Sequence, residues 1–499
     1  MVRVEEEEEE EEIGGIVSPA ESTAAEPGSE DDDSLLDALT PAFDRILGKR
    51  IYEDEDREPL RDCSNAERKQ CTKATPVTVR QLKEKVAVMW SDAGRAHENG
   101  ADHQESRARL DVLVGEGGAL RDMCGVDVEE SVARAPIADV VRVHDYEYVA
   151  HVEGRCKEGK ALDTDTPVSP GSFDAALAAA GAALEAVDRV ATRRRAAFVV
   201  ARPPGHHAGP RGAAPCRELF DARPDMCSCG FCLFNTVAIA GAYARYRYAE
   251  TKVGANELVF GKVAIVDVDV HHGNGTAEIV AGLRPRQVNL PLPSSWPPQS
   301  TLAYKPWLDE SDAEHVFFAS IHLRAPGFYP GGGAAGENTD RLVNVALAPP
   351  GGPRPGDAAA RRALSASARK ALVDKCSAHF RAAVERDLLP KLAAFAPDLL
   401  LISAGFDGHH SDLYYYLDDQ DYYWITRSLL QAAKPKAVVS VLEGGYAVIA
   451  ADPPTTTLRR TRQQTATARV PDDQQDSLCG LAAAAKAHVK ALADYQPRL

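Results

Sequence analysis

The sequence predicts an α/β fold: a single three-layer α/β/α domain built on a mainly parallel central sheet. Short runs rich in Val, Ile and Leu alternate with longer helical stretches. Strands that are apolar on both faces are typical of parallel sheets covered by helices on either side. The predicted strands are 196–202, 262–270, 316–323, 343–347, 399–403 and 436–443, and the predicted helices are 233–250, 365–395, 421–433 and 477–495. Pro390 is expected to kink or end the second of these helices.

Three segments interrupt this alternation. Residues 1–80 contain the run Glu5–Glu12 and little apolar sequence, so we expect an acidic, mostly disordered tail ahead of a domain at 81–499. The Pro-rich stretch 284–307 is expected to be a surface excursion. The polar, basic stretch 451–475 is expected to be a disordered insertion.

Charge and composition exclude several classes of function. The formal charge is −17, but residues 1–60 hold 21 acidic and 5 basic side chains. The rest of the chain is therefore nearly neutral, without the strongly basic surface of a nucleic-acid-binding protein. No apolar run approaches the ~20 residues that cross a bilayer, and the N-terminus has no apolar signal core. We expect a nuclear or cytoplasmic protein whose ten cysteines are thiols or ligands.

Chemically reactive residues follow four of the predicted strands. In doubly wound sheets, ligands bind beyond the carboxyl ends of the strands, so residues placed there are expected to converge. They are His206 and His207 after 196–202, Asp267, Asp269 and His271 at the end of 262–270, Asp407 after 399–403, and Tyr446 after 436–443. Because an unpaired buried carboxylate is costly, two aspartates within an apolar strand require a cation or hydrogen bonds as compensation.

The spacing of these acids predicts a metal site. Asp267, Asp269 and His271 stand at i, i+2 and i+4, which places them on one face of an extended strand. Two carboxylates and an imidazole suit a divalent metal, with zinc the first choice. If Asp269, His271 and Asp407 are the ligands, a position stays open for water or substrate, and Asp267 would orient an imidazole. The alternative is a set of capping aspartates and hydrogen-bonded histidines without a metal.

At this point the motifs carry a family resemblance. RPPGHHAGP, CGFCLFNT, VDVDVHHGNGT, SIHLRAPGFYPGGG, SAGFDGHHSD and LEGGY occur in the order found in zinc-dependent histone deacetylases, with class II features, and the chain resembles them over roughly 86–446 plus the terminal helix. The resemblance implies an arginase/deacetylase-like fold. It also implies hydrolysis of the acetyl group from N6-acetyl-lysine in histones or other proteins, with zinc as the cofactor.

The resemblance further implies roles for individual residues. Asp269, His271 and Asp407 would bind zinc, His206 and His207 would be the tandem catalytic histidines, Asp267 and Asn274 would orient them, Tyr446 would donate to the transition state, Phe231 beside Gly230 and Tyr329 would be the walls of the acyl-lysine channel, and Asp165 would be the rim aspartate that holds the substrate backbone. Asp163 lies close enough to leave the rim assignment open. Backbone carbonyls around Asp267, Asp269 and His271, with Ser320, resemble a structural K⁺ site.

General chemistry agrees with these assignments. Zinc polarises an amide carbonyl and acidifies its bound water. His207 is expected to take the proton of the water and later return it to the lysine amine. Tyr446 would stabilise the developing oxyanion. A narrow aromatic tunnel suits the neutral, extended acetyl-lysine stem.

The sequence departs from the family pattern in three places. Ala447 follows Tyr446 where Asn is usual, just before the insertion, and a displaced Tyr446 would leave a site that binds zinc but turns over slowly. His409 and His410 stand beside Asp407, and we interpret them as loop residues rather than a second metal site. A C-x-C-x₂-C pattern is interpreted as buried thiols rather than a metal cluster; its members are Cys227, Cys229 and Cys232, with Cys216 upstream.

Rival functions share much of this chemistry. Deacetylation of polyamines or other small acyl-amines needs the same zinc site, although we identify no acidic gatekeeper in the sequence. Arginases share the architecture but use two manganese ions and more ligands. A weakly active scaffold that binds acetyl-lysine is the third possibility, and Tyr446 argues against it. The expected partners are histone tails or other acetylated proteins and a co-repressor type of complex, with no sequence-specific nucleic acid and no membrane.

Overall fold

The computed structural model describes residues 85–193, 196–213, 228–250, 257–289, 295–448 and 479–495. The predicted acidic tail at 1–80 and the predicted insertion at 451–475 lie outside the described residues. None of the helices in the described ranges combines the length and apolarity that crossing a bilayer requires.

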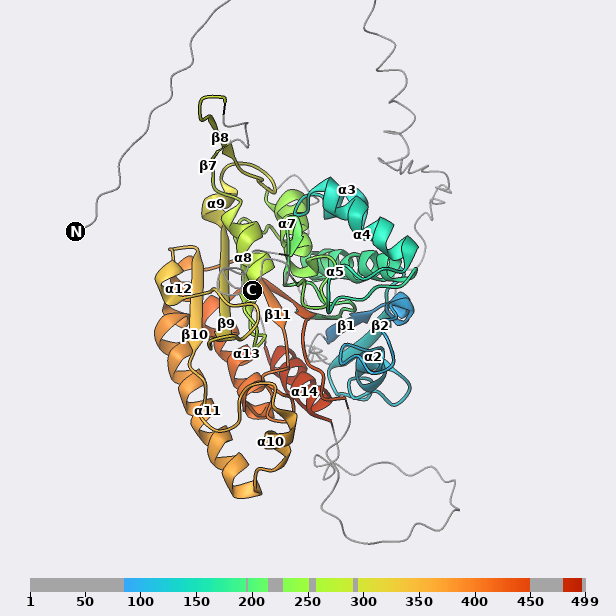
Figure 1. Cartoon of the computed structure of the whole chain (residues 1–499), viewed down its shortest axis with the longest axis vertical. Helices are drawn as coiled ribbons and strands as arrows, with labels where there is room; N and C mark the ends of the chain where they lie inside the picture. Colours follow the sequence, from blue (N-terminus) through green and yellow to red (C-terminus); the bar gives the residue numbers. More distant parts are fainter. Residues whose placement is uncertain are drawn as a thin grey trace, which may run out of the picture. The chain divides into compact units, whose positions relative to one another are not determined.

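An eight-stranded sheet forms the centre of the described domain (Figure 1). Its strands are, in spatial order, β10 (Leu342–Leu347), β9 (Val316–Leu323), β6 (Val263–Asp267), β11 (Leu399–Ala404), β12 (Ala437–Leu442), β3 (Ala196–Val200), β1 (Val86–Trp90) and β2 (Val126–Glu130). Every neighbouring pair is parallel. The six predicted strands are confirmed. The sequence did not predict β1 and β2; three of the five residues in β2 are acidic.

Helices and short hairpins connect the strands. The α-helices are α2 (Ala108–Val114), α3 (Ile137–Val140), α4 (Tyr146–Glu158), α5 (Ser172–Arg193), α7 (Thr236–Tyr248), α8 (Asn274–Ala281), α9 (Asp312–His315), α10 (Ala358–Arg362), α11 (Ala366–Asp387), α12 (Leu389–Phe395), α13 (Asp419–Ala433) and α14 (Gly480–Ala493). The described residues also contain two 3₁₀ turns, η1 (Asp92–Ala96) and η2 (Ala335–Glu337), and two hairpins, β4 (Ala208–Gly209) with β5 (Gly212–Ala213) and β7 (Arg286–Asn289) with β8 (Ser300–Ala303).

The sheet separates two hydrophobic cores. On β1, Val86 and Val88 belong to a core completed by α2 and by α11 to α14, whereas Ala87 and Met89 belong to a core completed by α4, α5 and α7. Because successive side chains of a strand point to opposite faces, these cores lie on opposite sides of the sheet. The predicted three-layer α/β/α architecture is therefore confirmed.

The structure corrects the predicted end of one strand and confirms the predicted break in one helix. The strand predicted at 262–270 is too long, because β6 ends at Asp267. There the Asp267 carboxylate accepts the backbone N–H of Asp269 (3.0 Å), and Asp269 accepts the N–H of His271 (2.8 Å). Such side-chain to backbone bonds two residues apart turn the chain out of the sheet. The break near Pro390 is confirmed, since α11 ends at Asp387 and α12 begins at Leu389.

Candidate metal and catalytic site

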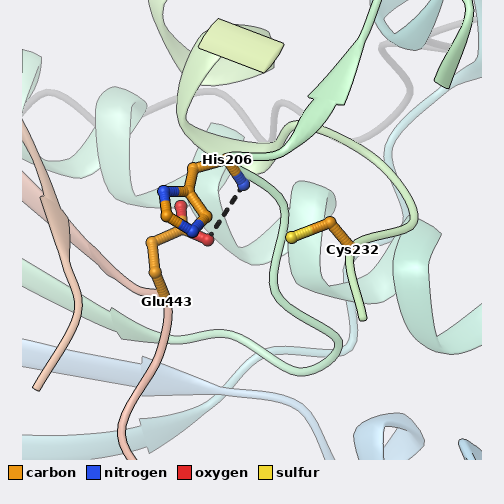
Figure 2. Close-up of side chains that lie close together, drawn as sticks. All are labelled: His206, Cys232 and Glu443. Atoms are coloured by element: carbon orange, nitrogen blue, oxygen red, sulfur yellow. Dashed lines mark hydrogen bonds between the residues drawn. The ribbon is translucent and has the colours of Figure 1, made fainter. Parts of the chain in front are cut away.

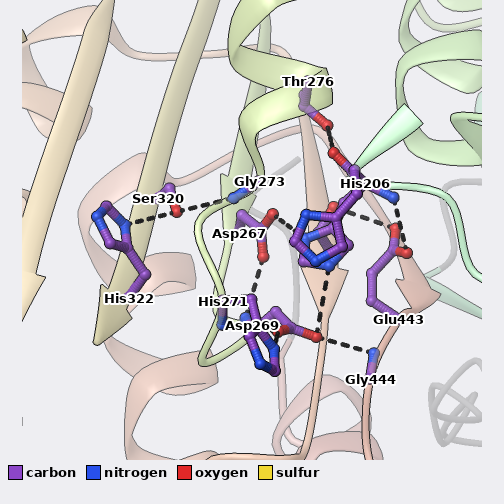
Figure 3. A network of polar contacts seen from close by, with 12 residues as sticks. His206, Asp267, Asp269, His271, Gly273, Thr276, Ser320, His322, Glu443 and Gly444 are labelled. Carbon is purple, nitrogen blue, oxygen red and sulfur yellow. Dashed lines mark hydrogen bonds and ion pairs between the residues drawn. The ribbon is translucent and has the colours of Figure 1, made fainter. Parts of the chain in front are cut away.

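The residues of the candidate site lie at or just after the carboxyl ends of four adjacent strands. β6, β11, β12 and β3 are neighbours at the centre of the sheet. The loops that follow their carboxyl ends bring together side chains from distant parts of the sequence, as Figure 3 shows for His206, Asp269, His271 and Glu443. The convergence predicted from the four strand ends is therefore observed.

Asp269, His271 and Asp407 form a buried group of potential metal ligands. One atom of each lies within 4.8 Å of the others. Nδ1 of His271 lies 3.1 Å from Oδ1 of Asp269 and 2.9 Å from Oδ2 of Asp407. Oδ2 of Asp407 is buried and lacks a partner with hydrogen-bond geometry. Two carboxylates, one imidazole and an unsatisfied buried oxygen fit a divalent cation of the zinc type.

The electrostatics of this group also fit a cation. Burial raises the pKa of Asp407 to about 7, and Asp269 adds to the rise. Burial by itself lowers the pKa of His271, but Asp407 and Asp269 together raise it to about 9. The two carboxylates thus attract positive charge to one point. A divalent ion bound between them would supply that charge.

His206 and His207 lie beside this group with different hydrogen-bond partners. Their ring centroids are 4.0 Å apart. Nδ1 of His206 lies 2.8 Å from Oδ2 of Asp267, and Nδ1 of His207 lies 2.7 Å from Oδ1 of Asn274. The pairing of Asp267 and Asn274 with the two histidines is as the resemblance implied.

The two partners give the histidines different charges. Burial opposes a charge on His206, but Asp267 and Asp269 raise its pKa to about 10. Burial lowers the pKa of His207 well below its usual value, and the neighbouring His206 lowers it further. His207 is therefore neutral at pH 7, whereas His206 carries a proton.

Tyr446 lies on a turn whose backbone is held by several hydrogen bonds. A carboxylate oxygen of Asp412 accepts the backbone N–H of Tyr446 (2.7 Å) and of Ala447 (3.1 Å). The carbonyl of Ala447 accepts the N–H of Leu481 at the start of α14 (3.2 Å). These bonds hold the turn in place, and the last one joins it to α14, which follows the stretch 451–475 in the sequence.

Aromatic rings surround the approach to these groups. The Phe231 ring lies 5.7 Å from the Tyr446 ring, and the Tyr329 ring lies 4.8 Å from the His207 ring. The hydroxyl of Tyr329 donates to the carbonyl of Ser228 (2.8 Å), which fixes its position. Gly230 has a φ of 53°, and a Cβ atom there would stand 2.5 Å from Cδ2 of His207. A side chain at 230 would therefore strain the backbone and displace a tandem histidine.

The two rim candidates differ in their contacts. Asp163 accepts the backbone N–H of Cys229 (2.7 Å) and of Asp165 (3.1 Å), so both of its oxygens hold the loop. Asp165 is exposed and accepts from the hydroxyl of Ser228. Although the residue as a whole is exposed, partial desolvation of its carboxyl group and a hydrogen bond with Asp163 raise the pKa of Asp165 to about 6. Asp165 is thus the more exposed acid of the pair.

A second buried group, His206, Cys232 and Glu443, also has ligand atoms within 4.8 Å of one another (Figure 2). Its groups are already engaged. His206 bonds Asp267, and the Cys232 thiol donates to the carbonyl of Gly230 (3.5 Å). One oxygen of Glu443 accepts two backbone N–H groups. This group is a hydrogen-bonded cluster rather than a second metal site.

The extra histidines beside Asp407 and the cysteines of the C-x-C-x₂-C pattern are not part of the candidate metal site. Nε2 of His409 lies 3.0 Å from Asp419, and Nδ1 of His409 accepts the N–H of Ser411 (3.2 Å). Neither His409 nor His410 joins a potential metal-binding group in the described ranges. Cys229 and Cys232 are buried free thiols, whereas Cys216 and Cys227 lie outside the described residues.

Sequence reasoning missed several supports of the site. Phe328 stacks on the His271 ring at 5.1 Å, and Tyr414 meets that ring edge-on at 4.7 Å. The guanidinium of Arg109, fully buried, lies 5.2 Å from the Tyr446 ring and donates to the carbonyl of Gly445 (2.8 Å). Arg109 falls outside the motifs used for the prediction. The glutamate of LEGGY, Glu443, was the available signal for a buried acid beside the site.

The fold and the site together define an α/β protein with a parallel central sheet and a candidate metal centre at the carboxyl ends of its strands. A model of the histone deacetylase domain family matches residues 103–458, and the chain belongs to this family. Uncharacterized protein slr0245 from Synechocystis is 34% identical over 371 residues, which cover 72% of this chain and 94% of that protein. Type-2 histone deacetylase 2 from Dictyostelium discoideum is 31% identical over 300 residues, which cover 57% of this chain and 13% of that protein. The crystal structure of the HDA15 HD domain aligns with a TM-score of 0.55 and 25% identity, covering 82% of this chain and 91% of that one.

Proposed function

We propose that the protein hydrolyses the acetyl group from N6-acetyl-lysine in proteins, histone tails among them, with zinc held by Asp269, His271 and Asp407. The observation that carries the proposal is this buried group of two carboxylates and an imidazole with the paired rings of His206 and His207 beside it. Bound zinc supplies a Lewis acid that polarises the amide carbonyl and acidifies a water molecule. Action on histones in the nucleus, or on other acetylated proteins in the cytoplasm, belongs to the same proposal. The proposed reaction does not involve the K⁺ that the resemblance implies at Ser320.

His207 acts as the general base. The amide oxygen of Asn274 only accepts hydrogen bonds, so Nδ1 of His207 carries the ring proton and Nε2 presents a lone pair. Nε2 takes one proton from the attacking water as the water oxygen bonds to the amide carbon. When the carbon–nitrogen bond breaks, the same proton goes to the lysine amine, so that acetate and a free lysine leave.

Tyr446 and His206 stabilise the negative charge that develops. The Tyr446 hydroxyl donates to the carbonyl oxygen as it becomes an oxyanion. His206 stays protonated through its contact with Asp267 and offsets the nearby carboxylates. Phe231 and Tyr329 enclose the uncharged acyl-lysine stem, and Asp165 accepts hydrogen bonds from the substrate backbone at the rim.

Turnover of acetyl-lysine peptides by zinc-loaded protein tests this proposal. The comparison substrate is acetylspermidine, which shares the amide but lacks a peptide backbone. We expect the peptide to be hydrolysed with the higher kcat/KM, because Asp165 and the aromatic walls suit a lysine stem on a backbone. Preference for acetylspermidine would assign the protein to small acyl-amines. A zinc-loaded protein inert on both substrates would leave only a binding role.

A further inference from the structure

Glu443 is a buried carboxylate that contacts the backbone at the start of the loop that carries His206 and His207. Its side chain has no exposed surface. Oε2 accepts the backbone N–H of Gly205 at 2.8 Å and of His206 at 3.1 Å, and Figure 2 shows the second of these bonds. The N–H donors stand 238 and 237 residues away in the sequence. One oxygen therefore fixes the start of the loop that carries both histidines.

The backbone around Glu443 joins the other parts of the site. Its N–H donates to the carbonyl of Ala404 at the end of β11 (3.0 Å), and its carbonyl accepts from Arg109. The next N–H, that of Gly444, donates to Oδ2 of Asp269 (2.8 Å), as Figure 3 shows. Tyr446 follows two residues later on the same turn. Glu443 thus links the histidine loop, the candidate metal ligand Asp269 and the tyrosine turn.

We infer that Glu443 is a positioning residue that holds the tandem-histidine loop in register with the Tyr446 turn. The inference rests on the proposed function for its catalytic meaning. A buried N–H that loses its acceptor must find another partner or remain unpaired, so removal of the carboxylate allows the His206 backbone to shift. A shift of about 1 Å in a catalytic group costs up to about 100-fold in rate. Glu443 acts through His206 and His207 and does not touch the substrate.

Three substitutions separate the role of the acceptor from that of the charge. Glu443→Gln keeps the side-chain length and an oxygen that accepts both N–H groups, and it removes the charge. Glu443→Asp keeps the charge but withdraws the oxygens by one methylene. Glu443→Met keeps the volume and removes the acceptor. Asp312→Asn is the control, because Asp312 is equally buried and its Oδ2 likewise accepts backbone N–H groups away from the site, those of Trp307 (2.8 Å), Leu308 (2.6 Å) and Asp309 (3.1 Å). Its Oδ1 also accepts from Arg245 (2.7 Å), so some loss of stability is expected from this variant.

We expect Glu443→Gln to retain wild-type kcat, and Glu443→Asp and Glu443→Met to lose about 10- to 100-fold in kcat with little change in KM or bound zinc. Asp312→Asn is expected to lower Tm without lowering kcat per folded molecule. If Glu443→Met fails to fold, Glu443→Asp carries the comparison. Wild-type kcat in Glu443→Asp, or a loss in Glu443→Gln as large as in Glu443→Asp, would overturn the inference.

Proton NMR of the imidazoles gives a readout that does not depend on turnover. The hydrogen-bonded Nδ1 protons of His206 and His207 should resonate downfield and keep their positions in Glu443→Gln. We expect both resonances to shift or disappear in Glu443→Asp. If wild-type protein hydrolyses no acyl substrate, the proposed function fails, and these resonances still decide whether Glu443 positions the loop. Unchanged resonances in Glu443→Asp would count against it.

Discussion

Nδ1 of His207 and Oδ1 of Asn274 lie 2.7 Å apart in the buried end of the site. Because a carboxamide oxygen cannot donate, this contact determines which ring nitrogen of His207 carries the proton. The neighbouring histidine, His206, bonds a carboxylate at the equivalent position. Burial lowers the pKa of His207, whereas Asp267 and Asp269 raise that of His206, so the pKa values of two adjacent imidazoles move in opposite directions.

Replacement of Asn274 by Asp should move the acidic limb of the pH profile of kcat/KM to higher pH. Burial lowers the pKa of His207 in the wild type. A carboxylate at the Asn274 position would attract a proton and raise that pKa, so more of the base is protonated at a given pH. The limb is measured with an acetyl-lysine peptide from pH 5 upward. An unmoved limb would mean that another group is the base.

Tyr446→Phe should lower kcat by about 10²–10³-fold with a small effect on KM, because the hydroxyl acts on the transition state. Steady-state kinetics on an acetyl-lysine peptide measures the effect. Tyr423→Phe is the matched control, since Tyr423 lies on α13 away from the site and its hydroxyl donates to Asp494 (3.0 Å). Equal activity of Tyr446→Phe and the wild type would remove Tyr446 from the mechanism.

Asp407→Asn should lower zinc affinity by at least about 100-fold, because loss of a ligand costs more than loss of a group that orients one. Metal content after dialysis and competition with a chelator report the affinity. Asp419→Asn, which changes a carboxylate bonded to His409, should keep wild-type affinity. The metal centre would have to be assigned elsewhere if both variants bound zinc equally.

His488 should make the fold sensitive to mild acid. It bonds Thr426 (2.7 Å) and Ser440 (2.8 Å) in the core, and burial lowers its pKa to about 3. The unfolded chain binds the proton near pH 6.5, so the stability from neutral His488 is complete above pH 6.5 and declines as the pH falls. At pH 5 the loss amounts to roughly 2 kcal/mol.

Denaturant unfolding between pH 8 and pH 4 measures how the free energy of unfolding declines as the pH falls. His488→Gln should be less stable at pH 8 and should show a shallower decline below pH 6.5. His151→Gln, which changes an exposed histidine, should keep the wild-type slope. A His488→Gln slope equal to that of the wild type would assign the acid sensitivity to other groups.

The candidate site was largely predictable because its chemistry is concentrated at strand ends. Asp269, His271 and Asp407 interrupt apolar runs, and such interruptions are visible in a single sequence. The length of β6 was not predictable in this way. Its apolar alternation continues to Val270, but the bonds that Asp267 and Asp269 make to the following backbone end the strand early.

The sequence alone determined the strand and helix types, the order of the central motifs and the identity of the ligand-type side chains, because these depend on local composition and spacing. Tertiary structure decided the protonation of His206 and His207, the support of Tyr446 by Asp412 and Arg109, and the contact of Glu443 with Gly205. Each of these features depends on which groups from distant parts of the sequence are buried next to one another. Only the packing of the sheet and its loops brings them within hydrogen-bond distance.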